Sequence, residues 1–320
     1  MSFLDLGPTG ARRQRDVVAV LGRRRVRTAL ETGEVITPWA GVLVDPARAT
    51  EPVTLMTAAR LATGPLSVVT GPSAAFLHGL TSAAPTPVHL LLPYETRVQR
   101  RPGIVVHNGS NIDTDREDRD GLPVLSLDRV VSDLACTMYP PDALAVLDEA
   151  FAQLDELDRP AFRRRLRERL QVRPDPRGTV VGRRLVDLAT GRAESPSESR
   201  LLWRVVDLGF PVPEVNLPVR DLGGRLLYRL DLGWSKVLIA IEYNGYAAHV
   251  GREEHDEARI RDLTRRGWIV IVVGVEDLAN PVRLESELYA AFARRGVDLR
   301  ARVVGTLRPR RHREPRRTRS

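Results

Sequence analysis

The chain has one cysteine, Cys136, in 320 residues, so it cannot form an internal disulfide bond. A lone thiol is typical of proteins in a reducing compartment, which predicts the cytoplasm. No run approaches the about 18 consecutive apolar residues of a membrane-spanning helix. The first residues also lack the apolar core of a signal peptide. The sequence therefore predicts a cytoplasmic protein without a membrane partner.

Lysine is almost missing too, because Lys236 is the only lysine among 49 basic residues. Such an arginine bias, with abundant Ala, Gly and Pro, is typical of GC-rich bacterial genomes, so coding explains part of it. The net charge of +8, with a pI near 10.4, favours a polyanionic partner. The tail at 307–320 holds seven Arg and one Glu, so most of the excess lies in a segment of disordered composition.

The length and the 42% hydrophobic content predict two or three domains of the α/β (α+β) class. Pro, Gly and Arg at 173–178 are typical of an inter-domain connection. We expect a winged helix-turn-helix-like unit at 1–50, an α/β region at 51–185, a mixed sheet flanked by helices at 186–305, and a disordered basic tail at 306–320.

Residues 15–21 and 24–32 have helical apolar spacing, and Gly33 is suited to follow a helix C-terminus. The next segment, EVITPWAGVLVDP, predicts two strands around a turn. Helices followed by such a hairpin indicate a winged helix, and the alternative is a solvated helix face with a packing hairpin. In the first case DNA would be contacted by an arginine cluster: Arg23, Arg24, Arg25 and Arg27.

The middle region, 51–185, predicts alternating helices and strands without a chemical motif. Its strands are expected in SVVT, VHLLLP, GIVVHN and LPVLS. His78, His89 and His107 are too scattered to indicate a metal site, and we expect structural roles for them. The tryptophans of the last third are expected in the core or at its rim rather than as base-stacking platforms.

Two carboxylates stand on adjacent predicted strands of the last third, LLYRLDLGW and VLIAIEYNG. These strands carry Asp231 and Glu242, and the preceding helix carries Glu198, with Ser195 as its N-cap. A half-buried carboxylate is costly unless it is paired or binds a metal, and such oxygen donors suit Mg²⁺ or Mn²⁺. The alternative is that Asp231 and Glu242 pair with Arg229 or Arg259.

The spacing LDLGW–(2)–VLIAIEYNG–(3)–H–(6)–D–(2)–R–(3)–L–(3)–GWIVIVV resembles the very-short-patch-repair endonuclease group. More closely, it resembles an actinobacterial domain of unknown function in that group, and both belong to the PD-(D/E)XK nuclease superfamily. The resemblance covers the last third of the chain, roughly 194–303, and combines spacing, residue type and element order. The matching residues are Glu198, Asp231, Glu242, Gly245, His249, Asp256, Arg259, Leu263, Gly267 and Trp268.

The resemblance implies a metal-dependent phosphodiesterase site. Asp231 would be the central ligand, supported by Glu242 and by the carbonyl oxygen of Tyr243. Glu198 would act on the metal or on water. Assistance would come from two further residues, His249 and Asp256.

One position departs from the superfamily pattern, because Asn244 stands where a lysine is usual and an amide cannot act as a cation or base. Asn244 and Arg259 are expected to contact DNA. The front half, with SAAFLHGL, VHLLLP, RPGIVVH and LPVLSLDRVVSDLA, resembles abortive-infection-type antitoxins. Those proteins are DNA-binding transcriptional autoregulators with a winged-helix part, so this resemblance implies DNA binding.

We therefore predict a metal-dependent DNA endonuclease or nickase, serving DNA repair or phage defence. The alternative is a non-catalytic DNA-binding regulator of antitoxin type with a degenerate nuclease domain, and a third reading has RNA as the target. The sequence predicts no oligomeric state.

Overall fold

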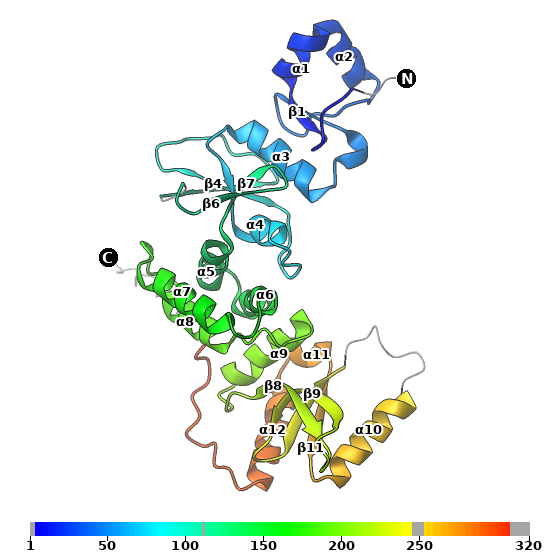
Figure 1. The fold of residues 1–320 in the computed structure, drawn as a ribbon, viewed down its shortest axis with the longest axis vertical. Coiled ribbons are helices and arrows are strands. Elements are labelled where there is room, and N and C mark those ends of the chain that lie inside the picture. The colour runs from blue at the N-terminus through cyan, green and yellow to red at the C-terminus, as the bar shows by residue number, and fades with distance from the viewer. Residues whose placement is uncertain (1–3, 111–112, 245–252, 308–320) are drawn as a thin grey trace, which may run out of the picture. The chain divides into compact units, whose positions relative to one another are not determined.

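The computed structural model describes residues 4–110, 113–244 and 253–307, and at 253–256 it describes the backbone alone. The chain divides into two compact units, Met1–Leu134 and Ala135–Ser320. Helices and three sheets build both units, so the α/β class with several domains is confirmed (Figure 1). Within the described ranges, no helix has the length and apolarity needed to cross a membrane.

The first unit begins with two short helices against a two-stranded sheet. Buried Val17, Val26, Ala29 and Leu43 form its core. Gly22, at φ +81°, separates the helices, and Gly33, at φ +72°, follows the second as expected. The elements are β1 (Ala11–Arg13), α1 (Gln14–Leu21), α2 (Arg23–Glu31) and β2 (Val42–Val44).

The prediction of a hairpin after α2 is wrong about which strands pair. β2 pairs with β1, which precedes the helices, and the segment before the turn contributes a single bridge, Ile36 to Val44. Pro38 has no N–H to donate and Gly41 has φ +80°, so the segment between Ile36 and β2 is shaped as a turn rather than as a strand.

A five-stranded mixed sheet forms the rest of the first unit, in the order β5-β4-β3-β7-β6. The expected strands are present, and β6 is an additional one whose sequence, REDR, has no apolar alternation. Its elements are α3 (Pro52–Thr63), β3 (Val68–Val69), α4 (Gly71–Leu77), β4 (Val88–Pro93), β5 (Ile104–Gly109), β6 (Arg116–Arg119), β7 (Leu122–Leu125) and α5 (Leu127–Thr137), the last of which contains the division between units.

The second unit starts with a helical layer. The expected domain boundary at 185 falls inside the third of these helices, and the first of them packs on the helix that opens the endonuclease-like segment. Buried Asp148 joins the two: its carboxylate accepts hydrogen bonds from the N–H groups of Thr190 (2.7 Å) and Gly191 (2.9 Å) and from the Ser199 hydroxyl (2.8 Å). The layer contains α6 (Pro140–Ala152), α7 (Arg159–Gln171), α8 (Thr179–Leu188) and α9 (Pro196–Asp207).

A four-stranded sheet follows, in the order β11-β10-β9-β8, with β10 antiparallel to β9 and parallel to β11. The apolar run WIVIVV was expected as a central strand, but β11 is an edge strand, buried by contacts with the helices before and after it. The elements are β8 (Glu214–Arg220), β9 (Leu226–Trp234), β10 (Ile239–Tyr243), α10 (Glu253–Arg265), β11 (Ile269–Val273), α11 (Val275–Ala279) and α12 (Val282–Arg294).

Helices cover both faces of this sheet. On one face Trp234 meets Phe292 of α12 edge to face, with ring centroids 5.0 Å apart. On the other, Ala240 packs with Leu263 of α10. Neighbouring residues of a strand point to opposite faces, so Glu242 shares the α10 face with Ala240. The tryptophans of this unit, Trp203, Trp234 and Trp268, are buried, as expected.

Candidate functional site

Asp231 and Glu242 lie across from each other on two paired strands, Asp231 inside β9 and Glu242 next to the end of β10. The antiparallel ladder of β9 and β10 ends at the pair Leu232 and Ile241, so Asp231 and Glu242 are the next residues across it. The Tyr243 N–H donates a hydrogen bond to Oδ2 of Asp231 (2.7 Å). The register therefore places the two acidic residues across from each other, and the backbone N–H of Tyr243 lies against Asp231.

Burial raises the pKa of Asp231 above its ordinary value. The Tyr243 hydrogen bond and the Arg259 charge oppose this, whereas the Glu194 charge adds to it. The raised pKa means that the fold around Asp231 disfavours the ionised carboxylate.

Glu198 occupies the first turn of α9, where a local motif holds it. The Ser195 hydroxyl accepts a hydrogen bond from the Glu198 N–H (3.2 Å) and donates to Oε1 (2.9 Å), while the Glu194 N–H donates to Oε2 (2.7 Å). This capping box confirms the predicted helix start. Burial also raises the pKa of Glu198; its hydrogen bonds oppose the shift, and repulsion from Asp231 and Glu194 adds to it. Glu198 and Asp231 therefore lie within electrostatic range of each other.

The charge of Glu242 is compensated differently, because the Arg259 side chain of α10 forms an ion pair with it. Nη2 of Arg259 lies 3.1 Å from Oε1 and 3.0 Å from Oε2 of Glu242, and the same group donates to the Arg229 carbonyl. The Arg259 guanidinium also lies 5.8 Å from the Tyr228 ring centroid. Arg229 itself pairs with Glu194 (3.0 Å). The pairing of Glu242 with Arg259, one of the two alternatives from the sequence, is thus present in this structure.

The donor set suits a hard divalent cation in chemistry, because carboxylate and carbonyl oxygens are the ligands Mg²⁺ and Mn²⁺ prefer. Asp231 and Glu198 fit this role best, since each is a buried acid whose charge a cation would offset. Glu242 fits only if Arg259 releases it. As the side chains stand, no three His, Cys, Asp or Glu groups of the described chain are arranged to hold a metal ion.

The remaining predicted residues of this site fall in three classes. Asn244 follows β10, is exposed, and its N–H donates to the Val273 carbonyl (2.8 Å). Asp256 lies on α10, but its side chain is outside the described set. His249, together with the matching Gly245, lies outside the described residues altogether.

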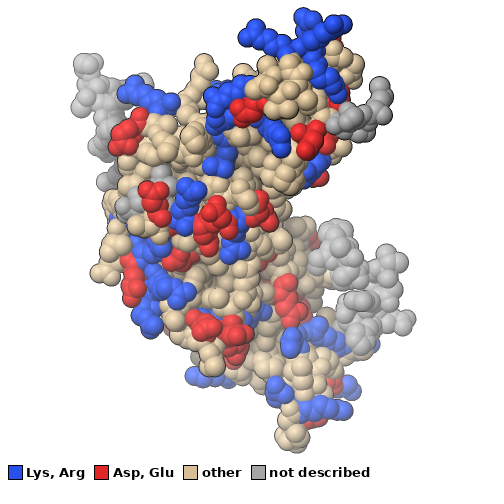
Figure 2. All heavy atoms as spheres, turned by 45° about the horizontal axis from the view of Figure 1, so that its top comes forward, with Lys and Arg blue, Asp and Glu red and all other residues tan. Residues whose placement is uncertain are grey.

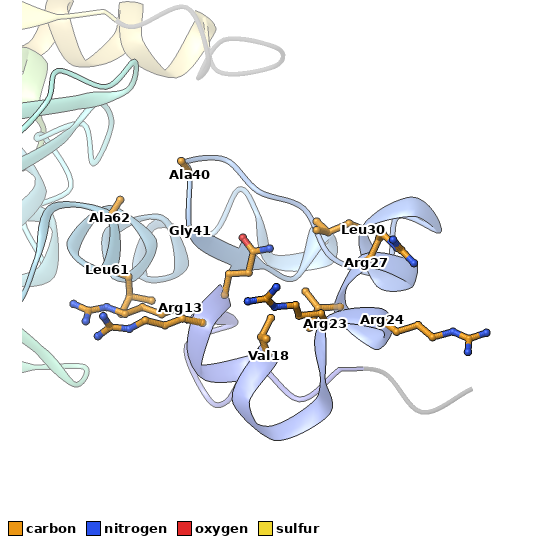
Figure 3. Close-up of a pocket in the computed structure, with 13 residues that line it drawn as sticks. Arg13, Val18, Arg23, Arg24, Arg27, Leu30, Ala40, Gly41, Leu61 and Ala62 are labelled. Carbon is orange, nitrogen blue, oxygen red and sulfur yellow. The ribbon is translucent and has the colours of Figure 1, made fainter.

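A second candidate surface lies in the first unit, where arginines line a groove of about 1050 Å³ (Figure 3). The groove runs along α1 and α2 and the start of β2. Three of its arginines belong to the predicted cluster and two were not singled out from the sequence, and its lining includes no carboxylate of the described chain. The five are Arg13, Arg15, Arg23, Arg24 and Arg27.

Arg25, the fourth member of the predicted cluster, does not line this groove. It forms an ion pair with Glu34 (2.7 Å), and Glu34 also accepts the Leu4 N–H (2.8 Å). Arg25 therefore anchors the start of the chain to the end of α2. Arg23 and Arg24, in contrast, form no ion pair with any described residue and are exposed. In Figure 2, Lys and Arg side chains gather at the top of the view, over these N-terminal helices.

The adjacent arginines of ARRQR could have pointed to Arg13 and Arg15, but their position depends on β1. β1 places Arg13 beside Leu61 of α3 in the groove lining, and no local pattern predicts that pairing.

The scattered histidines of the first unit are partly brought together. Nδ1 of His89 lies 3.0 Å from Nε2 of His107 across β4 and β5, and the rings stack with centroids 5.2 Å apart. Burial, and secondarily the charge of His107, lowers the pKa of His89 to about 4. His78 is buried with Nε2 2.8 Å from the Leu125 carbonyl oxygen. Hydrogen-bonded positions of this kind accord with structural roles.

No family model matches the chain. It is similar to two proteins of Mycobacterium tuberculosis, the uncharacterized protein MT2308 of strain CDC 1551 / Oshkosh and the uncharacterized protein Rv2248 of strain ATCC 25618 / H37Rv. Each is 29% identical over 287 residues, which cover 88% of this chain and 99% of the relative. The crystal structure of the RV2827C protein from the same species matches with a TM-score of 0.39 and 19% identity, over 66% of this chain and 83% of that one.

Proposed function

We propose that this chain is a DNA-processing protein whose second unit hydrolyses phosphodiester bonds with the help of Mg²⁺ or Mn²⁺, as an endonuclease or nickase of the kind used in DNA repair or phage defence. The observation that carries the proposal is the placement of Asp231 and Glu242 across from each other on β9 and β10, with Asp231 close enough to Glu198 to contribute to the raised pKa of Glu198. Clustered acids with perturbed pKa values are a mark of functional sites.

The cation would be held by the carboxylates of Asp231 and Glu242 and by the Tyr243 carbonyl. Once bound, such an ion activates water and neutralises charge on a phosphodiester. Glu198, whose pKa is raised, is suited to exchange a proton with water. Arg259, when it leaves Glu242, becomes available to a phosphate oxygen, and exposed Asn244 can donate to the DNA backbone.

The partner proposed for this site is DNA, and the arginine groove of the first unit supports that choice. Exposed arginines that lack carboxylate neighbours attract phosphates, and their contribution weakens with added salt. Arg23 and Arg24 meet this description. Arg27 has a weak, exposed ion pair with Glu31 (3.8 Å), whereas Arg25 is neutralised more closely by Glu34 (2.7 Å).

The test is the conversion of supercoiled plasmid to nicked circles in the presence of Mg²⁺ or Mn²⁺. Asp231→Asn is the informative variant, because the amide oxygen can still accept the Tyr243 N–H while the charge is lost. Glu257→Gln is its matched control, since Glu257 is an exposed acid of α10 that pairs with Arg261 (3.0 Å) among the described residues. We expect nicking by the wild type and by Glu257→Gln, and none by Asp231→Asn.

A second function is favoured by two observations. Glu242 is already neutralised by Arg259, and Asn244 stands where catalysis would benefit from a lysine. Both suit a non-catalytic DNA-binding regulator with a nuclease-like module. If the wild type binds plasmid DNA without nicking it under any of these metals, the catalytic proposal is wrong and the regulator remains. An RNA substrate in parallel separates the two nucleic acids.

A further inference from the structure

A pocket of about 470 Å³ opens within the second unit on the side of α9. Its size lies within the range of small-ligand sites, roughly 300–1,000 Å³. The walls come from the start of α6, from α9, from the end of β10 and from α11. The residues that matter here are Tyr139, Asp142, Arg200, Trp203, Arg204 and Tyr243.

Two aromatic side chains form one wall of this pocket. The rings of Tyr139 and Trp203 have centroids 6.2 Å apart and are tilted by 49°. Tyr139 is 61% exposed, which is unusual for a large aromatic residue at a pocket, while Trp203 is buried. An exposed aromatic face beside a buried one provides a surface on which a flat ring can stack.

The indole N–H of Trp203 is buried and has no hydrogen-bond partner among the described residues. A buried donor without an acceptor costs about 1–3 kcal/mol, so the fold leaves a polar group beside this pocket incompletely satisfied. Charged groups stand nearby: the Asp142 carboxylate accepts from Arg200 (2.8 Å), and the Arg204 guanidinium lies 5.1 Å from the Trp203 ring centroid. The pocket therefore offers a stacking face together with donors and an acceptor.

Two residues that line the pocket are sequence neighbours of acidic residues. Its lining includes Ser197, the neighbour of Glu198, and Tyr243, the neighbour of Glu242. The Tyr243 N–H is the group bonded to Asp231. A flat ring seated here would thus lie beside α9 and β10, the two elements that carry Glu198 and Glu242.

We propose that this pocket receives a single unpaired nucleobase of DNA, so that the substrate of the second unit is DNA with a bulged or otherwise unpaired nucleotide. Aromatic faces stack on any base, and fixed polar groups read a base edge, whereas a base inside an intact duplex cannot reach such a pocket. Extrusion costs a few kcal/mol and least for a base without a partner, which favours the unpaired nucleotide. The proposal rests on the proposed function, since it assigns the DNA that the carboxylate site would meet.

The experiment measures fluorescence anisotropy of labelled duplex DNA with the full-length protein. The two probes are a duplex with one bulged adenine and the same duplex without it, and Ca²⁺ replaces Mg²⁺ to prevent turnover. Base stacking on an aromatic side chain is worth enough for a preference of about tenfold. We expect the wild type to bind the bulged probe about tenfold more tightly.

Three variants identify the pocket as the source of that preference. Tyr139→Ala should bind the two probes equally, and Tyr139→Phe should keep the preference because the ring remains. Tyr94→Ala is the matched control, since Tyr94 is similarly exposed (65%) but lies in the first unit. Circular dichroism and thermal unfolding show that the variants are folded, as an exposed side chain leads us to expect.

Each outcome bears on one proposal or on both. Equal binding of the two probes by the wild type overturns the base pocket, and plasmid nicking then still stands or fails separately. A loss of affinity for both probes in Tyr139→Ala, with the preference unchanged, also overturns the base pocket. A protein that neither binds nor nicks DNA overturns this inference and the proposed function together.

Discussion

Arg259→Met is the substitution that separates a metal site from a purely structural ion pair. In the wild type, Nη2 of Arg259 lies within 3.1 Å of both Glu242 carboxylate oxygens. Methionine keeps an aliphatic stem against Tyr228 and removes the charge. Without metal, half-buried Glu242 then loses its ion pair with Arg259. With metal, Arg259 no longer competes with the cation for Glu242.

The magnitude follows from the geometry. At a separation near 3 Å and an effective dielectric constant of ~20, the attraction is about 5 kcal/mol before desolvation. Desolvation cancels much of this, and the side chains retain 28% and 15% of their exposure, so solvent screens the pair further. We therefore expect Arg259→Met to lose about 1–3 kcal/mol of unfolding free energy in the absence of divalent cations.

The metal dependence should run in the opposite direction. A ligand that binds only the folded state stabilises it by RT ln(1 + [L]/Kd), about 2.7 kcal/mol at a hundred times Kd. In the wild type the cation must displace Arg259 from Glu242, whereas in the variant it does not. At each Mg²⁺ or Mn²⁺ concentration, the gain in stability should be larger for Arg259→Met than for the wild type.

The assay is urea unfolding followed by tryptophan fluorescence, with NaCl at matched ionic strength as the salt control. Arg261→Met is the matched variant, because Arg261 pairs with Glu257 on the exposed side of the same helix (3.0 Å). It should change stability by less than about 0.5 kcal/mol with or without metal. If Mg²⁺ and Mn²⁺ stabilise Arg259→Met no more than the wild type, Glu242 is not a metal ligand and the reasoning is refuted.

Three further predictions concern other parts of the chain. Asp148→Ala should lose about 3 kcal/mol in urea unfolding, because it strands two buried N–H groups and a serine hydroxyl, whereas Asp148→Asn should lose less than about 1 kcal/mol. Gly178→Ala should lose about 2–4 kcal/mol in thermal unfolding, since φ is +75° and a Cβ would fall 2.1 Å from the Cys136 carbonyl oxygen; Gly224→Ala, at φ +83° but in open space, should lose about 1 kcal/mol. Replacing three groove residues with alanine, Arg23, Arg24 and Arg27, should lower the slope of log DNA affinity against log salt by about 2.7. Arg25→Ala, the control, should leave this slope unchanged.

The parts of the site that depend on local pattern were predictable. Ser195 followed by Pro196, with Glu198 three residues after the cap, specifies the start of α9 from neighbouring residues alone. The short connection between β9 and β10 then fixes their register, which brings Asp231 beside Glu242. Period-two alternation along two neighbouring strands was enough to place both acids.

The parts of the site and of the fold that depend on packing between distant residues could not be predicted from the sequence. The side chain that faces Glu242 depends on how α10 is rotated on the sheet, and that rotation is set by Leu263 against Ala240. The sequence therefore left Arg259 as one of two alternatives. β11 reads as a central strand because it is apolar throughout, but two helices bury it at the sheet edge. β6 was missed because a strand of charged residues carries no periodic apolar signal.

A comparison of two acids of the second unit, Asp148 and Asp231, indicates why the carboxylate cluster is a candidate for function rather than a purely structural arrangement. Burial raises the pKa of both Asp148 and Asp231. The oxygens of Asp148 accept hydrogen bonds from Thr190, Gly191 and Ser199, so the fold satisfies that charge. Asp231 accepts one hydrogen bond from the described residues, at Oδ2, and its nearest acids repel it.

The fold thus stabilises one buried carboxylate and leaves the other incompletely compensated. An apolar residue of similar size at this position of β9 would avoid the desolvation cost of Asp231, but it would leave the Tyr243 N–H without this acceptor. Positions that break the local rules of stability without a compensating contact are expected at functional sites. Asp231 is compensated only in part, by the Tyr243 N–H and the Arg259 charge, and it lies within electrostatic range of Glu198. A divalent cation would supply the missing compensation, which ties the site's electrostatics to the Mg²⁺ and Mn²⁺ dependence proposed for it.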